Sequence, residues 1–475
     1  MAAIPNDVFF NTITELNARL VTREFPAEEL ARAFSARLAR LGPQYNALAL
    51  ALPQPARRQA SAAGNDFKIG RLRGPLQGIP YGVKDLLSVA NQLTTWGAKP
   101  YASQAFDYSA TVIEKLDSVG AVLTGKLSMV ELAGAGGYRS TSASLFGPGL
   151  NPWDRSHWTG GSSSGPAAAV AAGLVTFAIG SETSGSIVTP ASYCGVTALR
   201  PTYGLVGRHG AMTLSWTLDK LGPFARSAED CGHILHAISG SDAKDPGSAG
   251  KSFYYTPQYV RPIKDLKVGF APVDFAERAD PAARPAFQAA LAALRETGVQ
   301  LVETRLPRFP YGPALFTILH TEGASAFESL IASPRLYDLA DPSQIAGLQA
   351  ALEIPARTYL KAMRVRRLIQ QAYAKLFSGV DLLVTFGRSG PAPKVERPIG
   401  LPAAAPEAAD PGFSGIIQAG NLAGLPALVL PCGFAGNLPV ALQLVGAPFA
   451  ENTLLAVGKE FQSRTDWHRR RPEGV

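Results

Sequence analysis

The chain has 475 residues, of which 46% are hydrophobic and only 17% are charged, and this composition excludes a disordered or fibrous protein. The formal charge of +8 does not indicate nucleic-acid binding, because the arginine clusters at 364–367 and 469–471 are short and lack interleaved aromatic residues. Three cysteines without a CxxC spacing indicate neither a disulfide framework nor a zinc site.

Hydrophobic periodicity predicts helices and strands that alternate along the chain. From Asp7 to Arg40 the apolar positions have helical spacing and are interrupted by Pro26, which predicts two helices. The elements predicted after them are, in chain order, a short strand in 78–87, a helix and then a strand in 109–123, a helix of small residues in 166–178 that runs into a strand at 174–179, a strand at 266–270, a helix at 281–297, a strand at 299–302, a long surface loop at 391–411, and buried strands at 427–430 and 440–445.

This alternation predicts a single large α/β domain, with a mixed and mostly parallel twisted β-sheet covered by helices on both faces. Residues 1–65 are expected to form an N-terminal helical segment of that domain, and residues 66–475 its main part. No period of 20–50 residues repeats, which sets solenoids and propellers aside.

Two clusters of serine and glycine flank the small-residue helix between residues 159 and 192. Flexible loops are one interpretation, but the rigid helix between the clusters argues against it. A phosphate-binding loop is a second interpretation, but the sequence contains neither of the phosphate-binding motifs GxxxxGK[ST] and GxGxxG. A nucleophile elbow at Gly161–Gly165 would make Ser163 the nucleophile, but no strand pattern precedes that motif.

Three separated motifs resemble the signature of the amidase signature family of serine hydrolases. They are Gly-Ile-Pro-Tyr-Gly-Val-Lys-Asp at 78–85, Gly-Gly-Ser-Ser-Ser-Gly at 160–165 and Gly-Ser-Glu-Thr-Ser-Gly-Ser-Ile at 180–187. Stretches that begin at Asn421, Pro431, Leu438 and Thr465 also resemble the family's C-terminal landmarks. The resemblance implies the fold of that family over nearly the whole chain, with 66–475 as the amidase signature domain.

The resemblance also assigns the catalytic groups. It implies that Ser186 is the acylated nucleophile, that Ser162, after a cis peptide, is a bridging serine, and that Lys84 is the terminal base. A serine hydroxyl needs a base to take its proton, and a lysine serves only when it is uncharged, which burial promotes. The apolar neighbours of Lys84 suit this role.

The oxyanion hole implied by the resemblance consists of backbone N–H groups from the turn at the nucleophile, those of Thr183, Ser184, Gly185 and Ser186. Substrate contacts are predicted for Tyr138, Gly137 and Ser163, the first two in a loop that is longer than the family's usual one.

The sequence departs from the family at three positions near these groups. Ser164 and Ser184 stand where the family usually has glycine, and Val188 stands where it usually has arginine. The loss of that charge predicts an altered pocket.

We expect a hydrolase that cleaves the C–N bonds of amides through a covalent acyl-enzyme on Ser186, with activity extending to aryl amides, esters and carbamates (urethanes). The expected partners are a small-molecule amide or carbamate and neither nucleic acid nor membrane, with the chain a monomer or homodimer. No cofactor or metal is expected. Without an apolar membrane-length stretch or a secretory pattern, a cytoplasmic location is expected.

Two alternatives stay open. One is the glutamine amidase subunit of a tRNA-dependent amidotransferase, which the residues at 184 and 188 disfavour. The other is a non-catalytic partner or nucleic-acid-binding subunit.

Overall fold

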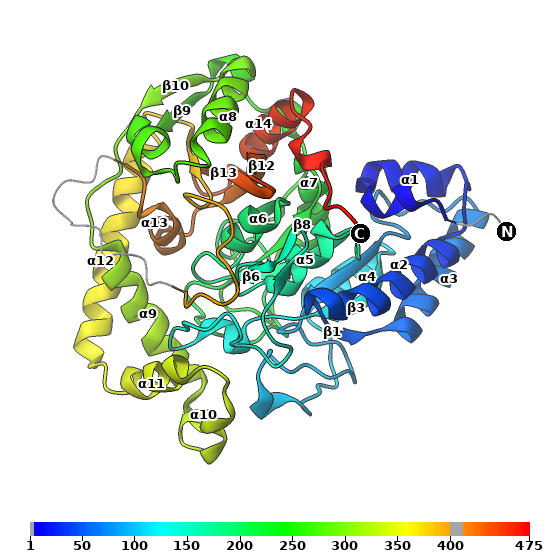
Figure 1. Cartoon of the computed structure of the whole chain (residues 1–475), viewed down its shortest axis with the longest axis horizontal. Coiled ribbons are helices and arrows are strands. Elements are labelled where there is room, and N and C mark those ends of the chain that lie inside the picture. The colour runs from blue at the N-terminus through cyan, green and yellow to red at the C-terminus, as the bar shows by residue number, and fades with distance from the viewer. Residues whose placement is uncertain (1–3, 400–411) are drawn as a thin grey trace.

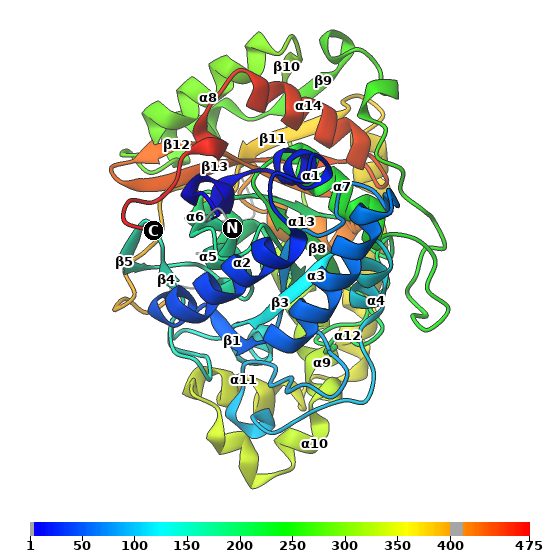
Figure 2. The same ribbon diagram turned by 90° about the vertical axis from the view of Figure 1, so that its right-hand side faces the viewer.

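The computed structural model describes residues 4–399 and 412–475, and one large β-sheet runs through this part of the chain (Figures 1 and 2). Eleven strands are hydrogen-bonded side by side within the described residues. In spatial order they are β1 (Leu48–Ala51), β3 (Val122–Leu127), β2 (Pro80–Lys84), β6 (Phe177–Glu182), β8 (Lys220–Ala225), β7 (Thr197–Arg200), β12 (Ala427–Ala435), β13 (Leu438–Gly446), β11 (Leu382–Phe386), β9 (Lys267–Phe270) and β10 (Gln300–Glu303). A separate hairpin is formed by β4 (Leu150–Asn151) and β5 (Asp154–Trp158).

The sheet is mixed, and its parallel pairs form two blocks. Strands β3, β2 and β6 are parallel to one another, as are β11, β9 and β10. The other six of the ten neighbouring pairs in the described residues are antiparallel. A hairpin such as β12–β13 has too short a connection for parallel strands, which need a long crossover. The predicted α/β class and the mixed sheet are confirmed, with the parallel pairing concentrated in these two blocks.

Helices cover both faces of the sheet. They are α1 (Ile13–Val21), α2 (Ala27–Leu41), α3 (Pro53–Lys68), α4 (Thr111–Ser118), α5 (Ser164–Ala171), α6 (Val188–Cys194), α7 (Ala228–Ile238), α8 (Arg284–Glu296), α9 (Tyr311–Ala326), α10 (Glu328–Ile331), α11 (Pro342–Ala351), α12 (Ala356–Leu376), α13 (Ile416–Ala423) and α14 (Glu451–Ser463). Helices α9 to α12 lie together along one side of the molecule (Figure 1).

The predicted elements match the structure closely where the periodicity is strong. Pro26 separates α1 from α2, and Thr12 caps α1 in a reciprocal box with Glu15. The small-residue helix is shorter than predicted, because α5 ends at Ala171 and the chain then enters β6. Residues 391–399 form no helix or strand, and the rest of the predicted loop, 400–411, lies outside the described residues.

The main core cluster draws on the chain from Val8 to Phe461, so the N-terminal helices pack into the same interior as the sheet. Helix α5 is buried at every residue, which its small side chains permit. Within the described residues, no helix has both the length and the apolar character needed to cross a membrane.

Each arginine cluster has a member that contacts another part of the protein. Arg366 is buried and donates hydrogen bonds to the carbonyl oxygens of Leu422 and Thr217, at 2.8 and 2.7 Å. Near the C-terminus, Arg470 forms an ion pair with Asp466 at 2.7 Å. Arg366 therefore ties α12 to the loop before β8 and to α13.

Candidate active site

Lys84 is the last residue of β2, where the parallel pairing with β6 brings two strand ends together. Val83 is opposite Ile179 in this pair, so the C-terminal ends of β2 and β6 reach the same edge of the sheet. Lys84 is fully buried, and its Nζ lies 2.9 Å from the Oγ of Ser181 on β6.

Ser162 lies in the loop that connects β5 to α5. The Gly161–Ser162 peptide bond is cis, and Ser162 is fully buried with its Oγ 2.7 Å from Lys84 Nζ. The start of α5 packs closely against Ser128, the residue that follows β3. A Cβ atom added to Gly165 would lie only 2.5 Å from the backbone nitrogen of Ser128. Glycine at 165 is therefore required for this close approach.

The Lys84 amine has an environment that favours its uncharged form. Burial lowers its pKa from 10.5 to about 7, although the nearby carboxylates of Asp219 and Glu182 act in the opposite direction. Within the described residues, no carboxylate lies within 4 Å of Lys84 Nζ. Its neighbours at hydrogen-bond distance are the two serine hydroxyls.

Ser186 lies in the turn between β6 and α6 and is 8% exposed. Gly185 has a φ of +84°, a left-handed conformation that favours glycine. The backbone N–H groups of residues 183–186 donate to no partner among the described residues. Such a turn can direct free N–H groups toward a developing negative charge.

Glu182 holds this turn in place from inside the protein. Its Oε2 accepts hydrogen bonds from the backbone N–H groups of Ile187 and Val188, at 2.8 and 3.0 Å. Its Oε1 accepts from Arg200 at 2.7 Å and from Asn421 at 2.8 Å. All of these groups are buried.

The charge on Glu182 is strongly stabilised. Burial alone would raise its pKa, but the Arg200 guanidinium, together with Lys220 and the hydrogen bonds, lowers the pKa to about 2. Glu182 is therefore ionised near neutral pH, and β6, β7, α6 and α13 are joined around it.

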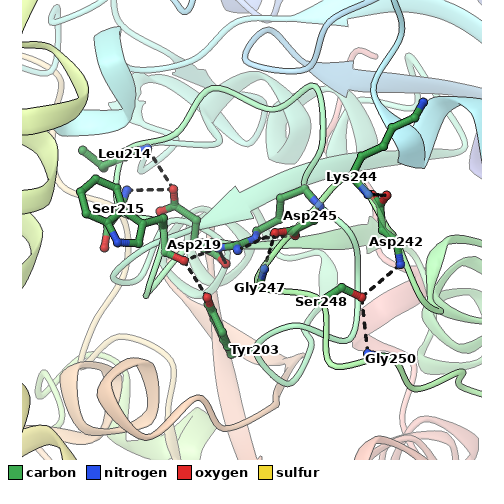
Figure 3. A network of polar contacts seen from close by, with 12 residues as sticks. Tyr203, Leu214, Ser215, Asp219, Asp242, Lys244, Asp245, Gly247, Ser248 and Gly250 are labelled. Carbon is green, nitrogen blue, oxygen red and sulfur yellow. Dashed lines mark hydrogen bonds and ion pairs between the residues drawn. The ribbon is translucent and has the colours of Figure 1, made fainter.

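Asp219 fixes the opposite side of the turn. Its Oδ1 accepts a hydrogen bond from the Thr183 hydroxyl at 2.5 Å. Its Oδ2 accepts from the N–H groups of Leu214 and Ser215 at 2.9 Å (Figure 3). Farther along the same loop region, Arg208 pairs with Asp245. The turn at residues 183–186 is thus attached to the 214–219 loop.

The predicted substrate residues occupy different environments. Tyr138 is half-buried, and its hydroxyl lies 3.0 Å from the position that a Cβ on Gly161 would take. Gly137 is half-buried and has a φ of +84°. The Ser163 hydroxyl is buried and donates to the Ser181 carbonyl at 3.1 Å, so it holds the loop against β6.

Two of the departures from the family create no backbone strain. Ser164 and Ser184 are not among the described residues with positive φ, so glycine is not required at either position. The Val188 side chain is fully buried at the start of α6.

Ser181, Glu182 and Asn421 are among the residues of this site to which the sequence pattern assigned no role. Ser181 and Glu182 belong to the same motif as Ser186. A charged glutamate among the small residues of that strand is a sequence signal that could have identified Glu182. Asn421 opens one of the C-terminal landmarks, but only the fold brings it to Glu182. Within residues 4–399 and 412–475, no group of three histidine, cysteine, aspartate or glutamate side chains is placed to hold a metal ion.

Comparison with known families agrees with this geometry. A family model described as Amidase matches residues 29–455. The chain belongs to the amidase signature family. It is accordingly an amidohydrolase that acts on the C–N bonds of amides.

Three similar proteins each align with nearly the whole of this chain. One relative, a glutamyl-tRNA(Gln) amidotransferase subunit from Chloroflexus aggregans, is 37% identical over 490 residues, 98% of this chain and 99% of the relative. The solved peptide amidase of Stenotrophomonas maltophilia has a TM-score of 0.81 and 30% identity, over 96% of this chain and 97% of that one. A chain from a vestigial protein complex connected with the evolutionary origins of an s-triazine catabolic enzyme has a TM-score of 0.85 and 29% identity, over 95% and 98%.

These relatives correct the expectation about partners. A small-molecule amide or carbamate substrate, no nucleic acid, and a monomer or homodimer were expected. That expectation is wrong, because the full-length relative at 37% identity is named as one subunit of an amidotransferase for glutamyl-tRNA(Gln). The character of the arginine clusters was the reason for excluding nucleic acid as a partner. That reason is insufficient, because a chain can bind a partner through surfaces that carry no such cluster.

Removing the charge of Glu182 should destabilise the protein. In Glu182→Gln the fully buried Arg200 loses its counter-ion, and we expect the free energy of unfolding to fall by about 3–5 kcal/mol in a urea titration. The control is Glu229→Gln, which removes an exposed ion pair with Lys459 and should change it by about 0–1 kcal/mol. Equal effects of the two variants would contradict this account of Glu182.

Proposed function

We propose that the chain hydrolyses amides through a covalent acyl-enzyme on Ser186, with Ser162 as the bridging hydroxyl and Lys84 as the terminal base. The observation that carries the proposal is the contact of 2.7 Å between the buried Lys84 amine and the Ser162 hydroxyl. A buried lysine with a pKa of about 7 is available as a base near neutral pH.

In the proposed reaction, Ser186 Oγ attacks the amide carbonyl while its proton passes to Ser162 Oγ. Ser162 in turn gives its own proton to Lys84 Nζ. Both transfers then reverse to protonate the leaving nitrogen, the C–N bond breaks, and an acyl ester remains on Ser186. Water attacks this ester by the same proton route, and the acid is released.

The negative charge on the tetrahedral intermediate would be held by the backbone N–H groups of residues 183–186. Their lack of other hydrogen-bond partners among the described residues supports this role, and the loss of one such donor typically costs about 3–4 kcal/mol of transition-state stabilisation. Glu182 and Asp219 keep the donors in place, since each holds one side of the turn.

For the substrate, we propose the carboxamide of glutamine, from which hydrolysis releases ammonia within a tRNA-dependent amidotransferase assembled with further subunits. The name of the relative at 37% identity supports this substrate, because the two chains align over nearly their full lengths.

A second candidate is a hydrolase of aryl amides, esters and carbamates, and two observations favour it. Val188 replaces the family's arginine, and the loop before Ser162 is enclosed by the rings of Tyr138, Trp158 and Tyr193. Such a wall suits an aromatic substrate group.

The pH dependence tests the lysine. The protonated amine is inactive as a base, so kcat/KM should rise about tenfold per pH unit below about 7 and level off above it. Ser181→Ala removes an oxygen that accepts from the charged amine, so its profile should have a midpoint at lower pH. A flat profile between about pH 5 and 9 would contradict a lysine base.

The nucleophile is tested by covalent labelling. A fluorophosphonate should modify Ser186, and the Ser186→Ala variant should neither react nor turn over an amide. The matched control is Ser163→Ala, which should keep the labelling site because the Ser163 hydroxyl is bound to β6. An adduct on Ser163 would refute the assignment.

The two substrate candidates differ in what the chain does without partners. Ammonia release from glutamine that depends on Ser186 and increases when the other amidotransferase subunits and Glu-tRNA(Gln) are added would support the first. Rapid hydrolysis of p-nitroanilides or aryl carbamates by the chain alone, with no turnover of glutamine in either setting, would support the second.

A further inference from the structure

A cavity of about 640 Å³ lies between residues 6–10, helix α2 and residues 471–475. Its volume is within the range of roughly 300–1,000 Å³ that is usual for pockets that hold small molecules. Phe10, Arg37, Arg40 and Arg471 are among the residues that line it, and the C-terminal end of the chain lies close to α2 in Figure 1. None of these residues belongs to the candidate active site or to the proposed proton route.

Arg37 lines this cavity and also binds the end of helix α5. Its Nε and Nη2 donate hydrogen bonds to the carbonyl oxygens of Gly173 and Ala172, at 3.0 and 3.1 Å. Arg37 is only 8% exposed, and its Nη1 donates no hydrogen bond to the described residues. The cavity is therefore at the opposite end of α5 from Ser162, and it contains a buried guanidinium with a donor that is not used.

Three guanidinium groups converge on the ring of Phe10. The Cζ atoms of Arg226, Arg471 and Arg37 lie 4.7, 5.3 and 5.6 Å from the centroid of this ring. The face of an aromatic ring attracts cations, but it carries no net charge. Three positive charges are thus held close together beside the cavity.

No carboxylate neutralises these groups at close range. Within the part of the chain that the structure describes, no carboxylate oxygen lies within 4 Å of the three guanidiniums or of Arg40. Burial lowers the pKa of Arg226 to about 10, and the charges of Arg471 and Arg37 add to this effect, whereas Asp230 opposes it. Cations that are partly buried without a counter-ion are costly, and a bound anion would reduce that cost.

We propose that this cavity binds the phosphate group of a small molecule, with Arg37, Arg40 and Arg471 as the donors. A phosphate monoester carries about −1.5 to −2 charges at pH 7 and three acceptor oxygens, and guanidinium forks match such oxygens in pairs. The lining has three arginines against one acidic side chain, Glu473, so a dianion offsets an excess of positive charge. The volume beyond the phosphate leaves room for an organic group beside Phe10. This binding site is separate from the hydrolysis proposed at Ser186 and does not depend on it.

Calorimetry with phenyl phosphate on the full chain tests the site. We expect wild-type protein to bind this probe, and Arg471→Gln and Arg40→Gln each to weaken binding at least tenfold. Both side chains are exposed, so the variants should fold, and thermal melting checks this. The matched control is Arg470→Gln, because it removes the same charge from the adjacent residue, which forms an ion pair with Asp466 at 2.7 Å. This control should keep the wild-type affinity.

Two further probes distinguish the source of the phosphate. Tighter binding of phenyl phosphate than of inorganic phosphate would support an organic phosphate as the ligand, and equal affinities would support free phosphate in the same site. Phenol should not bind at the same concentration. The phosphate site would be overturned by an absence of phenyl phosphate binding, by equal binding of phenol, or by equal losses of affinity in Arg471→Gln and Arg470→Gln.

Discussion

The site depends on a lysine amine that is buried without a counter-ion among the described residues. The adjacent strand provides a contrast, because Lys126 on β3 is equally buried but forms an ion pair of 2.8 Å with Asp85, the residue after Lys84. Burial lowers the pKa of both amines, yet only Lys126 has a carboxylate at hand to hold its proton. Since Asp85 is directed to Lys126, Lys84 is left with serine hydroxyls alone, which is the environment that a base requires.

The sheet supplies the geometry for this arrangement. Parallel neighbours end at the same edge, so β2 delivers Lys84 and β6 delivers Ser181 and the turn at residues 183–186 to one place. The central antiparallel strands then stabilise that edge, because Arg200 on β7 reaches the carboxylate of Glu182 on β6. The buried Glu182 in turn binds the backbone that follows Ser186, so a charge inside the protein controls the shape of the turn.

The groups that we propose as substrate contacts come from elsewhere in the chain. The loop with Tyr138, the β5 strand, helix α6 and the segment after β11 together surround the residues before Ser162. Asp341 holds the Tyr138 loop by accepting from the N–H groups of Arg139 and Ser140, at 2.6 and 2.7 Å. In the proposed function, chemistry at the sheet edge and selectivity in the surrounding loops are carried by separate parts of one fold, which would allow proteins with the same relay to act on different amides.

The sequence by itself determined the family motifs, the class of reaction and most elements with a strong hydrophobic period, because local spacing and short glycine-rich motifs carry that information. It did not reveal helices α9 to α12 or the order of the strands, since pairing is a property of distant segments. The ring of groups around Glu182 was equally hidden, because Arg200 and Asn421 lie 18 and 239 positions away from it in the chain. Only the tertiary structure decided which buried lysine has a carboxylate and which has none, because that difference arises from the direction of side chains on two adjoining strands.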